Sequence, residues 1–174
     1  VLEDPDTGGF RRGGETKRVV ERVQVAAARV IQPAAVTIGR DPLPNLVALA
    51  AHILNSGHEP DIGALAHHGG LAHAIAGLLK AFPIHAARGQ VFVPLEILER
   101  HGATPQHAVG GQASAELRAA LAELRGRARH HLHKAQDLIA TASPVVMPAL
   151  LPVALTGPTL ASMERSDYDP FVPV

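Results

Sequence analysis

The apolar positions along the chain recur at three- and four-residue spacing, which is the period of an amphipathic helix. The clearest stretch runs from Ser114 to Ala142, and its apolar stripe consists of Leu117, Leu121, Leu124, Ala128, Leu132, Ala135 and Ile139. The same spacing predicts further helices over residues 15–32, 45–54, 61–82 and 94–101. No stretch shows the alternation of apolar and polar residues that is typical of a strand. The pattern therefore predicts an all-α protein.

Turn-forming residues set the predicted limits of these helices. Asn45 and Asp61 are expected to cap the second and third helices, and Pro83 is expected to end the third. The tail contains six prolines after residue 143, which favours short helical pieces joined by turns. We expect residues 1–40 to form an unplaced lead and first helix, and residues 41–174 to form a helical domain.

Composition narrows the classes of function. The 174-residue chain is long enough for one domain, and its 16 basic side chains balance 16 acidic ones. This balance argues against a general nucleic-acid binder, which would carry a basic excess. The absence of cysteine excludes disulfides, thiolate zinc sites and cysteine nucleophiles. No apolar run is expected to reach the roughly 18 residues of a membrane-spanning helix.

Histidine is the most numerous residue type that can serve as a metal ligand, with 11 copies. His67, His68 and His73 are candidates for a metal site, and His130 and His133 form a second pair. No acidic ligand accompanies either group, and basic residues surround the second. We therefore expect solvated helix faces and no metal. Nucleophile motifs and phosphate-binding loops are absent from the sequence.

One segment carries a family resemblance. The stretch FPIHAARGQVFVP, residues 82–94, connects two predicted helices, and the tail contains SDYDPF. From about residue 41 to residue 174, these motifs and the helices around them resemble the squalene/phytoene synthase family. The resemblance implies an isoprenoid (terpenoid) synthase fold, of which this chain would hold only the C-terminal part.

The resemblance also implies where a substrate would bind. In catalytic members, the helix before this segment carries two aspartates four residues apart that bind magnesium and the substrate diphosphate. Those positions fall on Ala81 and His85, and neither side chain can hold magnesium as a carboxylate does. The pocket candidates implied by the resemblance are Gly70, His73, Gly77, Ala81, His85 and Arg88. Arg88 itself is expected to donate to helix-end carbonyls or to a carboxylate, and the catalytic residues stay unassigned.

Two functions from different classes follow. PxHxxRxxVFLP-like segments and the tail motif resemble a branch of the family that includes a mitochondrial assembly factor of respiratory complex I. This implies a non-catalytic protein that acts in complex I assembly or binds an isoprenoid or lipid, without a cofactor. Its partners would be protein, with peripheral membrane contact, in the bacterial cytoplasm or the mitochondrial matrix. The alternative is an active head-to-head prenyl transferase that uses allylic diphosphates and Mg²⁺, with metal ligands outside this chain.

Overall fold

The structure, a computed structural model, describes residues 42–56 and 62–174, and every described element is helical. The predictions for residues 1–40 and for Asp61 fall outside these residues. The helices are α2 (Pro42–Leu54), α3 (Gly63–Lys80), α4 (Phe82–Ala87), α5 (Leu95–Arg100), α6 (Pro105–Val109), α7 (Ala115–Ile139), the 3₁₀ helix η1 (Pro144–Leu150), α8 (Leu151–Ala154) and α9 (Thr156–Met163).

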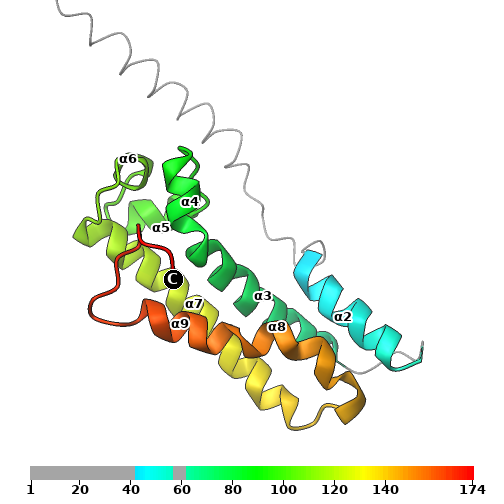
Figure 1. Ribbon diagram of the computed structural model, residues 1–174. Helices are drawn as coiled ribbons and strands as arrows, with labels where there is room; N and C mark the ends of the chain where they lie inside the picture. Colours follow the sequence, from blue (N-terminus) through cyan, green and yellow to red (C-terminus); the bar gives the residue numbers. More distant parts are fainter. Residues whose placement is uncertain (1–41, 57–61) are drawn as a thin grey trace, which may run out of the picture.

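The two longest helices, α3 and α7, lie side by side and make the most extensive contact in the structure (Figure 1). The predicted stripe of α7 faces this contact, because six of its seven members are buried and Ile139 is partly buried. Ser114 caps α7, since its hydroxyl accepts a hydrogen bond from the N–H of Leu117 at 3.2 Å. This confirms the predicted start of the helix.

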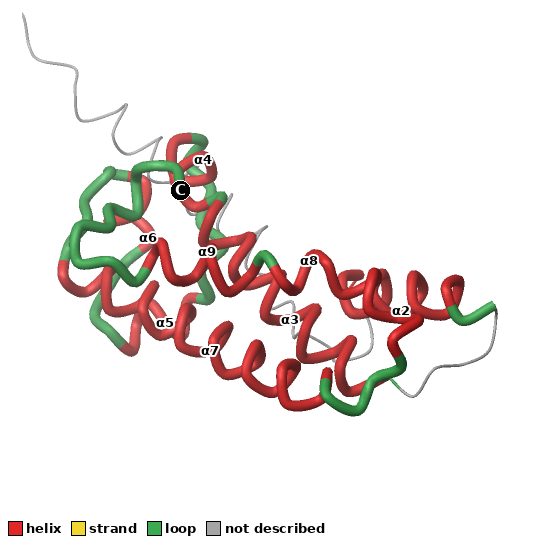
Figure 2. Tube along the Cα trace, turned by 60° about the horizontal axis from the view of Figure 1, so that its bottom comes forward, coloured by secondary structure: helices red, strands yellow, loops and turns green. Residues whose placement is uncertain are grey.

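The remaining helices complete two hydrophobic clusters at opposite ends of the α3–α7 pair. At one end, α2, η1 and α8 pack on α3 and on the C-terminal half of α7. At the other end, α4, α5, α6 and the chain terminus surround the N-terminal half of α7 (Figure 2). The segment FPIHAARGQVFVP belongs to this second cluster.

Glycine allows one close helix contact. A Cβ at Gly69 of α3 would stand 2.9 Å from Cγ2 of Val153 on α8, which is closer than carbon atoms can pack. Gly77 lies on the exposed side of the same helix, where a Cβ would meet nothing within 4 Å. The need for glycine at position 69 is therefore steric.

Four local predictions were wrong. Helix α2 begins at Pro42, three residues before the expected cap, because proline is favoured in the first turn of a helix. Pro83 does not itself end α3, which ends at Lys80, since it occupies the first turn of α4 after the break at Ala81. Helix α6 lies between residues 101 and 114, where no helix was predicted, and its start is a capping box at Thr104 followed by Pro105.

The fourth error is the expectation that no apolar run reaches the length of a membrane-spanning helix. The proline-rich tail does form short helical pieces, as predicted. Its helical pieces follow one another so closely that Pro144–Met163 forms one run of 20 residues with a mean hydropathy of 1.5. This run is long and apolar enough to cross a membrane by length and composition, and about a third of it is buried inside the protein. Its inner side chains, such as Val146, Leu150 and Leu160, belong to the hydrophobic core.

Candidate functional site

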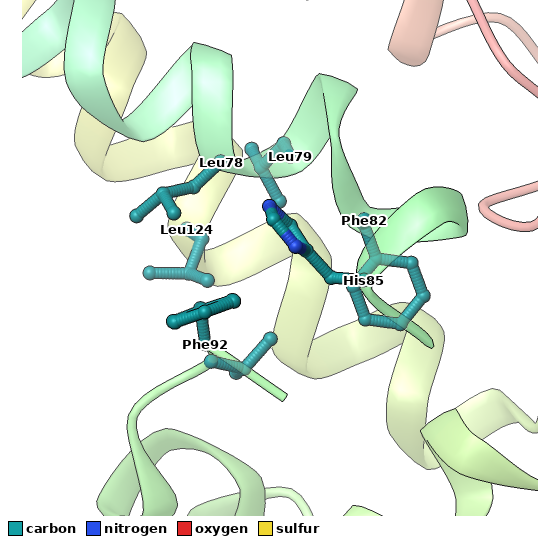
Figure 3. A pocket seen from close by; sticks show the side chains of 7 residues that line it. Leu78, Leu79, Phe82, His85, Phe92 and Leu124 are labelled. Atoms are coloured by element: carbon teal, nitrogen blue, oxygen red, sulfur yellow. The ribbon is translucent and has the colours of Figure 1, made fainter. Parts of the chain in front are cut away.

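His85 lies where the family resemblance implies a metal-binding aspartate, and apolar side chains surround it. Helix α4 directs the imidazole toward Phe92 of the following extended segment, with ring centroids 4.5 Å apart and nearly perpendicular planes (Figure 3). The Nδ1 atom of His85 is buried and has no hydrogen-bond partner among the described residues. The ring therefore takes part in packing.

The space beside His85 is small. The cavity there measures about 10 Å³ and is lined by Leu78, Leu79, Phe82, His85, Phe92, Val93 and Leu124 (Figure 3). A cavity of roughly this volume holds one water molecule at most. Its lining contains six apolar side chains besides His85 and no carboxylate. In this structure it has room neither for a prenyl chain nor for a hydrated magnesium ion.

Backbone conformation and backbone hydrogen bonds form the Arg-Gly turn after α4. Gly89 has a φ of +69°, a conformation that glycine adopts without strain. The N–H of Arg88 and the N–H of Gln90 both donate to the carbonyl of His85, at 3.0 and 2.9 Å. The side chain of Arg88 is exposed and forms no hydrogen bond or ion pair with the described residues. The expectation that this side chain caps the helix was therefore wrong.

The other pocket candidates are spread along α3 and its junction with α4. His73 is half-buried, and its Nδ1 lies 3.3 Å from the hydroxyl of Thr156 on α9. Gly70 is buried, Gly77 is exposed, and Ala81 forms the junction between the two helices. None of these four lines the cavity beside His85. Their assignment to a substrate pocket stays a prediction.

The predicted histidine candidates do not converge on one point. Nδ1 of His68 lies 2.8 Å from Nδ1 of His131 on α7, and the ring of His67 lies against both imidazoles. His73 is directed to Thr156 instead. Among the residues that the structure describes, no group of three or more histidine or acidic side chains could hold a metal ion.

Sequence reasoning did not find His131. It singled out His130 and His133, which are exposed on the same helix. The missed signal is its position three residues after the buried Ala128, at the edge of the apolar stripe of α7. Burial and neighbouring positive charge lower the pKa of both His68 and His131 below that of a free histidine.

The family model described as squalene/phytoene synthase matches residues 44–174. "NADH dehydrogenase (ubiquinone) complex I, assembly factor 6" is 28% identical in Mus musculus and 29% identical in Homo sapiens, over 108 residues. These residues are 62% of this chain and 32% of each relative. The chain thus spans about a third of the length of the relatives it matches.

A solved structure shows the same fold. The crystal structure of squalene synthase HpnC from Alicyclobacillus acidocaldarius superposes with a TM-score of 0.68 at 19% sequence identity. The match covers 90% of this chain and 61% of that one. It confirms the predicted all-α isoprenoid synthase fold and the expectation that this chain holds part of the full domain.

Substitution of His85 tests whether its surroundings are apolar packing. We expect His85→Asp to have a free energy of unfolding about 1–3 kcal/mol lower than His85→Leu, because a carboxylate beside Phe92 would lose water without gaining a partner. Urea unfolding of both variants measures the difference. Equal stability of the two variants would show that this position accommodates a charged ligand group.

The His68–His131 pair predicts a loss of stability in mild acid. Because the folded state lowers both pKa values, the unfolded chain binds more protons below about pH 6.5. The free energy of unfolding should therefore fall as the pH drops from 7.5 to 5.5, with His67, His130 and Lys134 adding positive charge nearby. Thermal unfolding across this range should show a shallower decline for His131→Gln than for the exposed control His52→Gln. Identical declines would contradict the prediction.

Proposed function

Because the chain belongs to the squalene/phytoene synthase family, we propose that it is a non-catalytic member that supports the assembly of respiratory complex I through protein contacts. One observation supports the proposal most: His85, where the family resemblance implies a metal-binding aspartate, packs against Phe92 beside a cavity of about 10 Å³. The choice of complex I as the assembled complex rests on the relatives named as complex I assembly factors.

The first argument concerns the leaving group of the family reaction. Ionisation of an allylic diphosphate places negative charge on the departing diphosphate, and magnesium held by carboxylates stabilises that charge. At the two positions in question, this chain offers a methyl group and an imidazole. The apolar lining beside His85 would raise the energy of a developing anion there. These features support a protein that has kept the fold without this reaction.

The second argument concerns the surface. Helix α2 and the run from η1 to α9 contain no Asp, Glu, Lys or Arg. Both segments expose large apolar side chains to solvent: Leu49 is 55% exposed, Ile53 67%, Leu151 66% and Leu155 67%. Because α2 and η1 pack on each other, these side chains lie on adjoining parts of the protein. We name Leu49, Ile53, Leu151 and Leu155 the apolar surface.

Exposed apolar side chains of this size and number are typical of a surface that binds a protein or a membrane. The proposal takes a protein partner in complex I assembly as the ligand of the apolar surface. It places the protein where that assembly occurs, in the bacterial cytoplasm or the mitochondrial matrix, peripheral to the inner membrane. Binding of an isoprenoid would need more room than the cavity beside His85 provides.

Charge on the apolar surface tests the proposal in cells whose own gene has been deleted. We expect the full-length protein carrying Leu49→Glu and Leu151→Glu to restore several-fold less assembled complex I than the wild type, because a carboxylate at an interface must lose its water. Native gels with an in-gel NADH dehydrogenase stain measure the complex.

Ala122→Glu is the matched control, since Ala122 is exposed on α7, outside the apolar surface. The level of each variant protein is measured in the same cells, so that loss of the protein is distinguished from loss of binding. Full restoration of complex I by the double variant would contradict a role for the apolar surface. Failure of the wild-type protein to restore complex I would contradict the proposed function itself.

A further inference from the structure

A second hollow, separate from the cavity beside His85, also lies against α7. It measures about 130 Å³ and opens between α7 and the segment that follows α9. Its polar lining consists of Arg118, Arg125, Glu164, Arg165, Ser166 and Tyr168. It shares no residue with the cavity beside His85 or with the pocket candidates that the family resemblance implies.

Two of the charged groups in this lining are already paired. Both oxygens of the Glu164 carboxylate accept hydrogen bonds from Arg129, at 3.2 and 2.6 Å. Arg165 donates to both oxygens of Asp167, each at 2.9 Å. Bidentate pairs of this kind satisfy the charge of both partners. The charge that the hollow presents to a ligand therefore comes mainly from its other side chains.

The other two arginines have no carboxylate partner among the described residues. Arg118 donates to two neutral carbonyls, those of Ala113 at 3.1 Å and Tyr168 at 2.7 Å. The guanidinium of Arg125 lies over the ring of Tyr168, 5.6 Å from its centroid, and makes no hydrogen bond that the structure shows. The nearby carboxylate of Asp169 accepts from the N–H of Phe171 at 3.0 Å. The guanidinium groups of Arg118 and Arg125 thus face the hollow together with the carboxylate of Glu164, which Arg129 already pairs, and Asp169 lies nearby.

Arg125 is the more unusual of the two, because it is partly removed from water. Burial lowers its pKa and raises the pKa of the phenol of Tyr168. The aromatic ring compensates only part of the cost of burying a guanidinium. An arginine held in this way keeps its planar fork of N–H donors available for an oxyanion. Ser166 adds a hydroxyl to the same lining.

We propose that this hollow binds a phosphate group, with Arg125 and Arg118 as its principal donors and Ser166 beside them. The volume of about 130 Å³ exceeds the space that one water needs and suits a single tetrahedral oxyanion. The phosphate belongs to inorganic phosphate, to a soluble phosphate monoester or to a lipid headgroup. The proposal is independent of complex I assembly, because it uses none of the apolar surface.

Calorimetric titration of the full chain with inorganic phosphate, at constant ionic strength set with chloride, tests the site. We expect saturable binding at one site and an affinity about tenfold lower in Arg125→Gln, which removes the unpaired guanidinium. Arg125→Lys keeps the charge without the planar fork and should weaken binding less. Arg127→Gln is the matched control, because Arg127 lies on the same helix, is exposed and pairs with Glu123.

Vesicles distinguish the sources of the phosphate. Binding to phosphatidylcholine vesicles that contain phosphatidic acid, but not to phosphatidylcholine alone, would assign the site to a lipid headgroup if Arg125→Gln abolishes it. Binding of inorganic phosphate without vesicle binding would assign it to a soluble ligand. A wild-type protein that binds neither probe would overturn the proposal. So would equal weakening by Arg125→Gln and Arg127→Gln, since that shows only a general effect of charge. Circular dichroism of each variant confirms that it is folded.

Discussion

The close packing of α3 on α7 is the interaction on which the rest of the structure depends. Small buried residues of α3, among them Ala66, Ala72 and Ala76, allow the aliphatic stripe of α7 to approach its backbone. The two hydrophobic clusters form at the ends of this pair, and every other described helix contributes to at least one of them. Dense packing of this kind leaves little freedom to open a cavity without rearranging the helices.

The packing determines what surrounds His85, the position where the family resemblance implies a metal-binding aspartate. Because α3 ends at Lys80 and α4 begins at Phe82, the chain directs His85 back toward α7 and Leu124. Phe92, from the segment after the Arg-Gly turn, closes the space from the other side. A site that handles a diphosphate needs charge and room, and this one offers apolar contact. The two proposed binding regions lie instead at the surface, at the exposed apolar side chains and in the arginine-lined hollow.

Much of the fold could be predicted from sequence, because the apolar residues of long amphipathic helices recur at a regular spacing. The stripe of α7 and the Ser114 cap are examples, and both depend on local spacing alone. Pro83 was misleading because proline that ends one helix is equally suited to the first turn of the next. The pairing of His68 with His131 and the grouping of Arg125 with Tyr168 depend on contacts between distant segments. Periodicity carries no information about such contacts, and a sequence motif such as SDYDPF, which includes Tyr168, does not say which distant residue it meets.

The central claim is that the packed environment of His85 has replaced the diphosphate chemistry of the family. Its most direct test is the release of diphosphate from farnesyl diphosphate by the full-length protein with Mg²⁺, beside an active squalene synthase as the positive control. The account predicts no release above a protein-free blank, because neither charge nor space at Ala81 and His85 favours the departing anion. Release well above the blank, dependent on both protein and Mg²⁺, would contradict it.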